Sequence, residues 1–422
     1  MAGSRDLPAW LAWQSSLHPR AIVMGLERVR AVWARLSPPK APPPVITVAG
    51  TNGKGSTVAF LEGFLASAGY RVGTYTSPHL SHYAERIRLE GRDVSEPLLC
   101  QAFERIEVAR QGVPLTYFEF GTLAALDLFS RTALDVWVLE VGLGGRLDAV
   151  NLIDASVAVV TTIGFDHQDW LGHHLDQIAG EKAGICRPGR PLVIGQAEAP
   201  AALRPAAETL GATCWQAGRE YEVSLLADGW DWRGPVGVHR HLPFPTLRGE
   251  HQIANAACAL MALDRLTDCL PVDIAAIQRG LIETHPPGRC QVYPGNPTWI
   301  LDVAHNPQAV AALAAVLQSL PCQGRTLAVF SCLADKDPQG MAEALEGMVD
   351  RWYLAPLEGP RSLSGEAIQA ALRAGGITSI QCYADFSQAL AKAHQEADSR
   401  DQILVFGSFL AVAAAMKHTD PA

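Results

Sequence analysis

Residues 45–57 constrain the fold of this chain more than any other stretch. Residues 45–49 are all β-branched or apolar, which is typical of a buried parallel strand. A turn with three glycines follows at 50–56, and the apolar positions from residue 58 onward have helical spacing. A strand, a glycine turn and a helix N-terminus in that order predict an anion-binding loop in an α/β sheet.

The lysine inside this turn indicates which anion the loop binds. Glycines allow backbone N–H groups to converge on a phosphate, and Lys54 can reach the outer phosphates of a nucleotide. A hydroxyl at Ser56 or Thr57 can face a metal ion. The general pattern Gly-x4-Gly-Lys-Ser/Thr is not met, because Gly55 separates Lys54 from Ser56. An ordinary glycine-rich turn is the alternative, and we favour a loop that binds a nucleoside triphosphate.

Composition excludes several other classes of protein. The chain has 422 residues, which suggests two or three domains, and 48% of them are hydrophobic. The net charge of −9 argues against a nucleic-acid or membrane surface. Nine cysteines without a Cys-x-x-Cys pair fit a reduced compartment. With no evident signal peptide and no long apolar run, we expect a cytoplasmic protein without a membrane partner.

Polar residues follow several predicted strands, at the edge where open α/β sheets bind ligands. A strand over 71–76 ends in a Thr-Ser-Pro-His turn, and a strand over 135–140 delivers Glu140 at its end. In a nucleotide-binding sheet, that position often holds the carboxylate of a metal site. A further strand over 155–162 precedes His167, for which a ligand role and a structural role are both open.

Helices and strands are predicted in the remainder of the first part, and residues 214–245 have a β-rich, irregular pattern. Helical spacing predicts a helix over 21–36, and alternation predicts a short strand over 85–89. Lys182 closes a short helix, where a lysine is ordinarily a solvated cation.

A second domain is predicted near the C-terminus. From residue 298 onward, strands and helices alternate regularly, which predicts a smaller doubly wound domain. Proline and glycine before it predict a boundary, so we divide the chain into domains 1–286 and 297–422 with a linker at 287–296. Polar clusters at 302–307 and 334–337 follow the first two strands of this domain.

Two functional classes fit these residues. One is an ATP-consuming ligase, and the other is a binding protein in which the phosphate loop acts as a switch. ADP release that depends on a small acceptor would separate them.

Six motifs in chain order carry a family resemblance. They occupy residues 50–56, 76–79, 139–148, 181–185, 287–289 and 302–307. The chain resembles the folylpolyglutamate synthase family, relatives of the Mur ligases, over nearly its whole length. Residues 115–119 resemble the bifunctional form, which is also a dihydrofolate synthase. A monofunctional folylpolyglutamate synthase or another Mur-type amino-acid ligase is the alternative.

The resemblance implies an α/β fold and a mechanism. The expected fold is a Mur-ligase-like ATPase domain with a parallel central sheet and a P-loop, followed by a smaller Rossmann-like doubly wound domain. A substrate carboxylate attacks the γ-phosphorus of ATP, and the amine of L-glutamate then attacks the acyl phosphate. Cations must screen the phosphates during that attack.

The resemblance also implies site residues. The ATP contacts are Thr51, Asn52, Gly53, Lys54, Gly55, Ser56, Asn255, Arg289 and Asp302. The metal ligands are Ser77, Glu140 and His167. The catalytic residues are Lys54, His167 and Lys182, with Lys182 carbamylated to N6-carboxylysine. The substrate contacts are Thr116, Tyr117, Phe118, Glu119, Leu147, Asp148 and Ala149 for the pterin, and His305 and Ser408 for glutamate.

The ligands implied in this way are small molecules. They are ATP as a substrate, dihydropteroate, reduced folates and L-glutamate, with one or two Mg²⁺ ions as the cofactor. The resemblance also admits a monovalent cation. We expect a monomer that binds neither nucleic acid nor membrane.

Overall fold

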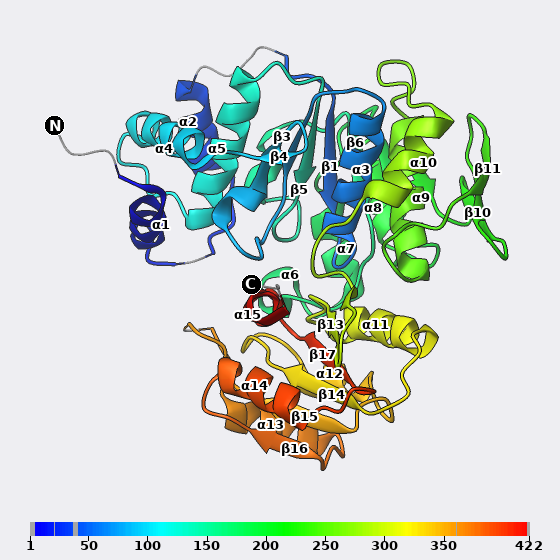
Figure 1. Cartoon of the computed structure of the whole chain (residues 1–422). Coiled ribbons are helices and arrows are strands. Elements are labelled where there is room, and N and C mark those ends of the chain that lie inside the picture. The colour runs from blue at the N-terminus through cyan, green and yellow to red at the C-terminus, as the bar shows by residue number, and fades with distance from the viewer. Residues whose placement is uncertain (1–4, 21, 37–40, 360, 420–422) are drawn as a thin grey trace. The chain divides into compact units, whose positions relative to one another are not determined.

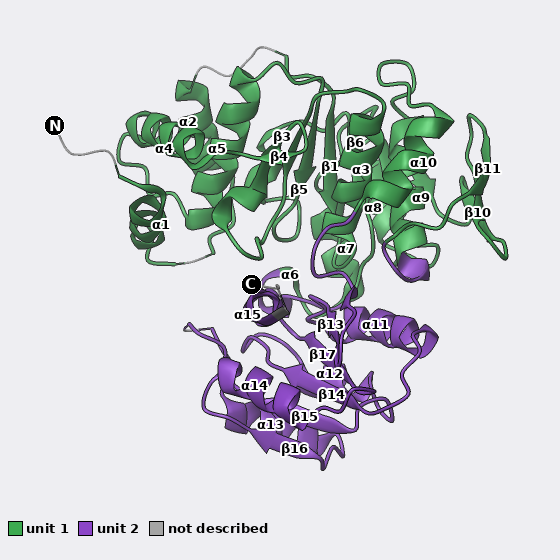
Figure 2. Cartoon of the chain, in the orientation of Figure 1, with its two compact units in different colours: residues 1–164, 171–246, 252–284 green, residues 165–170, 247–251, 285–422 purple. Residues whose placement is uncertain are grey.

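The computed structural model describes residues 5–20, 22–36, 41–359 and 361–419. The chain divides into two compact units (Figure 2). Unit 1 contains residues 1–164, 171–246 and 252–284, and unit 2 contains residues 165–170, 247–251 and 285–422. The outer ends of the two predicted domains, at 1–4 and 420–422, lie outside the described residues, as does position 21 of the predicted helix over 21–36.

Unit 1 is built on an eight-stranded sheet of order β4-β3-β2-β5-β1-β6-β7-β8 (Figure 1). Its strands are β1 (Val45–Ala49), β2 (Val72–Tyr75), β3 (Ile87–Leu89), β4 (Arg92–Asp93), β5 (Val136–Glu140), β6 (Val157–Val160), β7 (Pro191–Ile194) and β8 (Thr213–Gln216). The neighbouring strands β2, β5, β1, β6, β7 and β8 are parallel to one another. Strands β3 and β4 pair in antiparallel fashion at the edge next to β2. The carboxyl ends of β2, β5, β1 and β6 are therefore neighbours at one edge of the sheet.

Helices cover this sheet. They are α1 (Leu7–Ser16), α2 (Glu27–Arg35), α3 (Lys54–Ser67), α4 (Glu96–Arg110), α5 (Tyr117–Arg131), α7 (Leu175–Ala183), α8 (Leu203–Thr209), α9 (Glu250–Asp264) and α10 (Ile274–Glu283). Helices α1, α2, α4 and α5 share one apolar core with Trp137 and Leu139 of β5. Helix α3, which begins at the glycine turn, packs against α10. A separate antiparallel sheet contains β9 (Glu222–Leu225), β10 (Trp230–Arg233) and β11 (Val238–Leu242).

Unit 2 has a six-stranded sheet of order β12-β13-β17-β14-β15-β16. Its strands are β12 (Gln291–Tyr293), β13 (Thr298–Leu301), β14 (Thr326–Phe330), β15 (Arg351–Leu354), β16 (Ile380–Cys382) and β17 (Gln402–Phe406). All pairs except β12 with β13 are parallel. The helices are α11 (Pro307–Ser319), α12 (Pro338–Glu343), α13 (Gly365–Ala374), α14 (Phe386–Glu396) and α15 (Phe409–Thr419). The predicted doubly wound alternation is confirmed.

Three local expectations need correction. The helix predicted over 21–36 begins only at Glu27, because Gly25 has a φ of +141° that is incompatible with a helix. Within the strand predicted over 85–89, Tyr83–Arg86 forms a 3₁₀ helix and only Ile87–Leu89 pairs as a strand. Residues 287–296 include β12, which pairs with β13, so this stretch belongs to the second sheet.

In a short helix, α6 (Gln168–Leu171), residues 168–170 belong to unit 2 and Leu171 belongs to unit 1. Among the described residues, no helix combines the length and the apolar character needed to cross a bilayer.

Candidate active site

The glycine turn after β1 is held by the turn after β6. The Thr51 amide donates to the Thr162 carbonyl over 2.7 Å, and the Thr161 hydroxyl donates to the Asn52 carbonyl over 2.6 Å. Gly53 is the N-cap of α3 and has a φ of +85°, which favours glycine. The loop thus reaches the N-terminus of α3 at the carboxyl edge of the sheet, where helix ends bind anions.

Lys54 and Asn255 flank this turn. The Lys54 ammonium donates to the carbonyls of Gly50 and Thr51 over 3.0 and 3.1 Å, so its charge lies over the loop. A Cβ atom on Gly53 would lie 2.4 Å from Oδ1 of Asn255, which comes from α9. The structure therefore brings Asn255 against the predicted ATP loop.

Ser77 and Glu140 lie together at the ends of the adjacent strands β2 and β5. The Ser77 amide donates to Glu140 Oε2 over 3.2 Å, and Glu140 is only 5% exposed. The predicted metal ligands of unit 1 are thus neighbours, and a backbone N–H group orients the carboxylate.

The loop after β5 carries Asp148, which caps a short 3₁₀ helix, Ala149–Leu152. Its carboxyl group accepts from the amides of Leu143 and Val150, each over 2.9 Å. Burial raises the pKa of Asp148 to about 7, against the opposing effects of these amides and the Lys54 charge. The neighbouring Leu147 carbonyl accepts from the Gly25 amide.

The other predicted pterin segment begins α5. Thr116 is its N-cap and forms a capping box with Glu119. The Glu119 carboxylate is also paired with Arg28 over 2.7 Å, so it stabilises the start of this helix. Tyr117 and Phe118 are half-buried. The Phe118 ring lies 6.1 Å from the Tyr75 ring and packs over Gly142, where a Cβ atom would lie 2.5 Å from it.

Lys182 lies on α7 and is 2% exposed, so it is not a solvated helix-end cation. Gly145 lets the loop after β5 approach α7, because a Cβ atom there would lie 2.9 Å from the Glu181 carbonyl. Glu181 also pairs with Arg146 over 2.8 Å.

In unit 2, four predicted residues lie near one another. The Arg289 guanidinium lies 5.4 Å from the centre of the Phe409 ring, and the His305 ring lies 5.9 Å from the same ring. Asp302 accepts from the amides of Cys290 and Ala304, each over 2.7 Å. Burial raises the pKa of Asp302. Ser408 directly precedes Phe409 and is buried.

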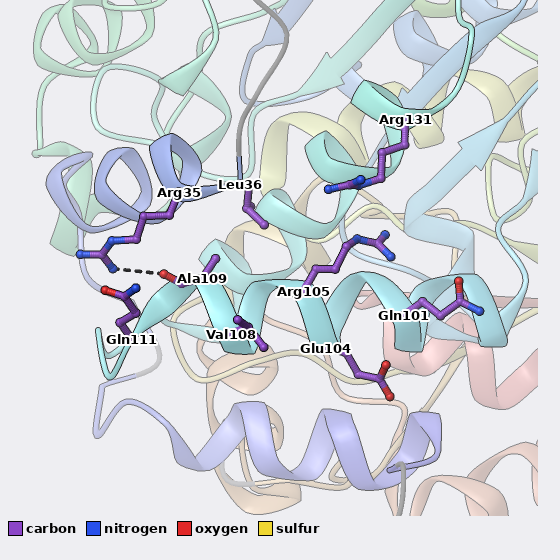
Figure 3. A pocket seen from close by; sticks show the side chains of 9 residues that line it. All are labelled: Arg35, Leu36, Gln101, Glu104, Arg105, Val108, Ala109, Gln111 and Arg131. Atoms are coloured by element: carbon purple, nitrogen blue, oxygen red, sulfur yellow. Dashed lines mark hydrogen bonds between the residues drawn. The ribbon is translucent and has the colours of Figure 1, made fainter.

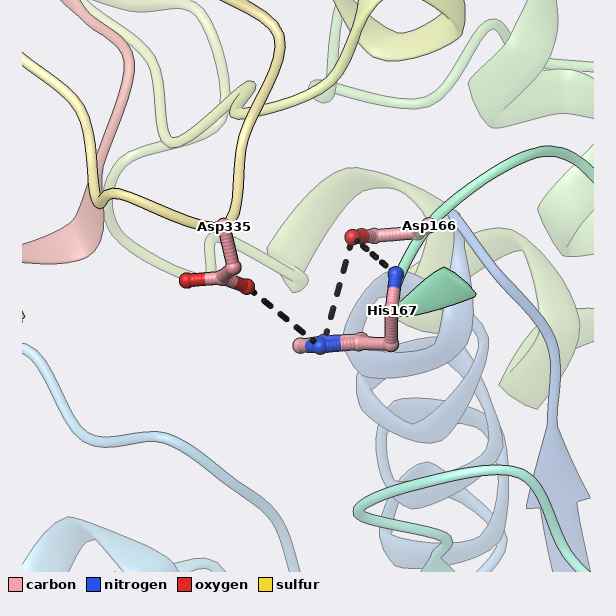
Figure 4. Close-up of side chains that lie close together, drawn as sticks. All are labelled: Asp166, His167 and Asp335. Carbon is pink, nitrogen blue, oxygen red and sulfur yellow. Dashed lines mark hydrogen bonds and ion pairs between the residues drawn. The ribbon is translucent and has the colours of Figure 1, made fainter. Parts of the chain in front are cut away.

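His167 lies in a charged cluster of unit 2 with Asp166 and Asp335 (Figure 4). Its Nδ1 atom is 3.5 Å from Asp335 Oδ2, and its φ is +50°, an unusual value for a residue other than glycine. Burial works against ionisation of Asp166, but a hydrogen bond from His305 and the charges of His167 and Lys336 hold its pKa well below the usual range.

Comparisons with known proteins identify the family. A family model for the Mur ligase middle domain matches residues 48–220, and one for the Mur ligase glutamate ligase domain matches residues 288–409. The chain is 44% identical over 414 residues to the dihydrofolate synthase/folylpolyglutamate synthase of Escherichia coli K12, covering 98% of this chain and 96% of that protein. The chain belongs to the dihydrofolate synthase/folylpolyglutamate synthase family.

Solved structures of this family agree over the same extent. "E.coli FolC in complex with DHPP and ADP" has a TM-score of 0.93 at 44% identity and covers 98% of both chains. A bifunctional folylpolyglutamate synthase/dihydrofolate synthase with Mn, AMPPNP and L-glutamate bound has a TM-score of 0.91 at 43% identity, again over 98% of both chains. The predicted Mur-ligase-like fold and family resemblance are confirmed.

The residues present fit the divalent ion expected in a dihydrofolate synthase/folylpolyglutamate synthase. The Ser77 hydroxyl and the Glu140 carboxylate are hard oxygen donors of the kind that Mg²⁺ prefers. They lie together in unit 1 at the edge that carries the phosphate loop. His167 supplies an imidazole and belongs to unit 2.

A pocket of about 590 Å³ lies elsewhere in unit 1, between α2, α4 and α5 (Figure 3). Arg35, Arg105 and Arg131 line it, but Arg105 and Arg131 are already paired with the buried Asp127. The residues that line this pocket include none of the predicted site residues of this family member.

Sequence reasoning missed the partners of His167. Asp166 is paired with Lys336 over 2.5 Å, and the Asn306 side chain donates to it over 3.3 Å. Asp166, Asn306 and Lys336 all follow predicted strands, and this was the available signal. Nothing local in the sequence of this family member indicates which of these polar residues contact one another.

Proposed function

We propose that this chain is an ATP-dependent amide ligase with two acceptors. It adds L-glutamate to dihydropteroate, giving dihydrofolate, and to reduced folates, giving polyglutamates. The full-length match to proteins of both activities carries the proposal, since it spans the phosphate loop and the second unit. Structures of such relatives hold DHPP with ADP, and Mn with AMPPNP and L-glutamate.

The chemistry is the same for both acceptors. The acceptor carboxylate attacks the γ-phosphorus, the bond to the β-phosphate oxygen breaks, and an acyl phosphate and ADP form. The neutral amine of L-glutamate attacks the acyl carbon, inorganic phosphate leaves, and the nitrogen loses a proton. Phosphorylation is needed because oxide is a very poor leaving group.

The phosphate loop and its neighbours form the proposed ATP site. Backbone amides at 51–56 and the N-terminus of α3 bind the phosphates, and Lys54 screens charge as the carboxylate attacks. Asn255 lies against the loop from α9. Arg289 and Asp302 contribute the remaining nucleotide contacts from unit 2, Arg289 to the phosphates and Asp302 to the ribose.

The proposed metal ligands are Ser77, Glu140 and His167. Mg²⁺ at these residues supplies positive charge to the phosphates of ATP. Glu140 is held in place for that role by the Ser77 amide.

Lys182 carries the proposed carbamate. The neutral amine of this buried side chain, which is 2% exposed, adds to CO₂ and loses a proton, which gives a carbamate with anionic oxygen donors. Lys182 therefore acts with Lys54 and His167 as the third catalytic residue.

Acceptor and glutamate are assigned to different segments. Residues 116–119 and 147–149 form the dihydropteroate site, with Phe118 against the pterin ring. This assignment is supported by the position of both segments at the carboxyl edge of the sheet. Phe118 packs over Gly142, which belongs to the loop that leads to Asp148. His305 and Ser408 form the glutamate pocket in unit 2.

We also retain the predicted organisation and compartment as proposals. The protein acts as a cytoplasmic monomer of two domains, the second of which includes the stretch 287–296 that was predicted as a linker. All nine cysteines are free thiols in the structure, which suits a reducing compartment.

Product analysis tests the proposal. The purified chain is incubated with ATP, Mg²⁺ and L-glutamate, with either dihydropteroate or tetrahydrofolate, and the products are separated by chromatography. We expect dihydrofolate from the first acceptor and a glutamate-extended folate from the second. Extension of tetrahydrofolate without any dihydrofolate would establish a monofunctional folylpolyglutamate synthase instead.

A further inference from the structure

Lys336 is a buried cation at the centre of the charged cluster of unit 2. Its ammonium lies 2.5 Å from Asp166 Oδ1 and 3.5 Å from Asp335 Oδ2. The Lys336 side chain is 5% exposed and that of Asp166 is 8% exposed. Such a pair is costly to bury and costly to break, because the partner left behind is an uncompensated charge.

The cluster has the residue types of a metal site, but Lys336 and Arg361, whose guanidinium lies 3.0 Å from Asp335 Oδ1, already provide positive charge there. Ligand atoms of Asp166, His167 and Asp335 lie within 4.8 Å of one another. Lys336 contacts both carboxylates at the same time. The Asn306 amide and His305 Nε2 lie 3.3 and 3.5 Å from the second Asp166 oxygen. Both oxygens of Asp166 are therefore engaged by side chains of unit 2.

These contacts determine where His167 lies. Asp166 Oδ1, which accepts from Lys336, also accepts from the His167 amide over 2.8 Å. Asp335 Oδ2, the other oxygen near Lys336, is 3.5 Å from Nδ1 of the His167 ring (Figure 4). A non-glycine residue keeps a φ of +50° only when its surroundings fix it. Lys336 thus supports the backbone of His167 through Asp166 and, together with Arg361, supports its ring through Asp335.

We propose that Lys336 is a positioning residue of the ligase reaction, whose ammonium holds Asp166 and Asp335 around His167 and so orients the His167 imidazole for the divalent ion. This inference rests on the proposed function, in which His167 is a metal ligand. Residues that orient a metal ligand typically affect metal affinity or activity 10- to 100-fold.

The test measures metal binding directly. Binding of Mn²⁺ to the full chain with AMPPNP is followed by electron paramagnetic resonance for wild type, Lys336→Met and Asp166→Asn. We expect each variant to bind Mn²⁺ about 10-fold or more weakly, and the double variant to bind it no more weakly than the poorer single variant. Lys392→Met is the matched control, because Lys392 is on α14 of the same unit and pairs with Glu396 at the surface.

Steady-state kinetics separate positioning from substrate contact. The apparent Mg²⁺ requirement of Lys336→Met should rise about 10-fold or more, while its KM for L-glutamate stays within about twofold of wild type. A raised KM for L-glutamate with unchanged Mn²⁺ binding would overturn the inference, because Lys336 would then contact the substrate. Unchanged Mn²⁺ binding in a folded Asp166→Asn variant would also overturn it.

Two further results keep the inference testable. If Lys336→Met does not fold, Lys336→Arg takes its place, because it retains the charge but has a different shape. We expect Lys336→Arg to weaken Mn²⁺ binding too, but by a smaller factor. Failure of the wild-type chain to release ADP would overturn the proposed function, and the Mn²⁺ comparison would still decide the role of Lys336.

Discussion

Asp148 in unit 1 and Asp166 in unit 2 are both buried carboxyl groups, yet their surroundings are opposite. Asp148 accepts only from backbone amides in the contacts described above, and burial raises its pKa to about 7. Asp166 is paired with Lys336 and lies near two histidines, which hold its pKa well below the usual range. Side-chain cations, and not burial alone, therefore decide which of the two is ionised.

The same contrast separates the two groups of candidate residues. The phosphate region of unit 1 combines backbone amides and glycines with the Lys54 ammonium. The cluster of unit 2 consists of charged side chains from three separate segments, at 166–167, 305–306 and 335–336. The first arrangement can adapt to an anion, whereas in the second the carboxylates of Asp166 and Asp335 are already paired with Lys336, and Asp335 also with Arg361.

Removing the Lys54 charge from the phosphate region gives the largest expected effect. Lys54→Ala should lower kcat about 10³-fold, because the charge is needed where the phosphates react. ADP release and circular dichroism measure activity and folding separately, and the surface variant Lys392→Ala should match wild type in both. Turnover of Lys54→Ala within tenfold of wild type would remove the loop from the mechanism.

Lys182 gives the next largest effect. Lys182→Ala should lose about 10²-fold in kcat, because the proposed carbamate oxygens are lost with the amine. A short-chain carboxylic acid should restore part of that activity by supplying a carboxylate in the space left by the side chain. The same acid added to wild type is the control. Absence of any rescue, combined with an unmodified mass for Lys182 in the native protein, would contradict the carbamate.

A matched glycine pair tests whether the turn is shaped for a ligand. Gly53 and Gly69 both have positive φ values, +85° and +92°, so alanine should cost about 1 kcal/mol of stability at either position. Only at Gly53 would the new Cβ atom meet another group, Asn255 Oδ1 at 2.4 Å. We expect KM for ATP to rise about tenfold in Gly53→Ala and to stay unchanged in Gly69→Ala. Equal KM values would mean that the turn does not contact ATP.

The smallest expected effect concerns the pH dependence of stability. Because the folded-state pKa of Asp148 is raised from 3.8 to about 7, its contribution to stability is complete below pH 4 and is lost as pH rises toward 7. Between pH 5 and 6, wild type should therefore lose about 1 kcal/mol relative to Asp148→Asn. Urea unfolding at several pH values measures this, with the exposed Asp176→Asn as control. Parallel curves for wild type and Asp148→Asn would show that Asp148 is ionised throughout.

Local patterns in the sequence were enough to predict much of the fold. The alternation of strands and helices predicted from residue 298 onward is present in unit 2, because apolar periodicity and turn residues are local signals. The phosphate loop was predicted for the same reason, as its strand, glycines and helix are contiguous. The strand β12 was missed because its few residues lie among prolines and glycines.

The charged cluster could not be predicted in the same way. Asp166 and Lys336 are 170 residues apart in the chain, and their contact depends on how three loops meet. The assignment of residues 165–170 to unit 2 likewise depends on tertiary contacts. Local spacing predicted that these residues follow strands, but pairing between distant loops leaves no periodic signal.

ADP release with two acceptors tests the central claim most directly. ADP is measured with dihydropteroate and with tetrahydrofolate, each with and without L-glutamate, using wild type and Lys54→Ala. The account predicts sustained ADP release with either acceptor only when L-glutamate is present, and about 10³-fold less from Lys54→Ala. ADP release that needs neither acceptor, or none with dihydropteroate and L-glutamate together, would contradict a ligase of both activities.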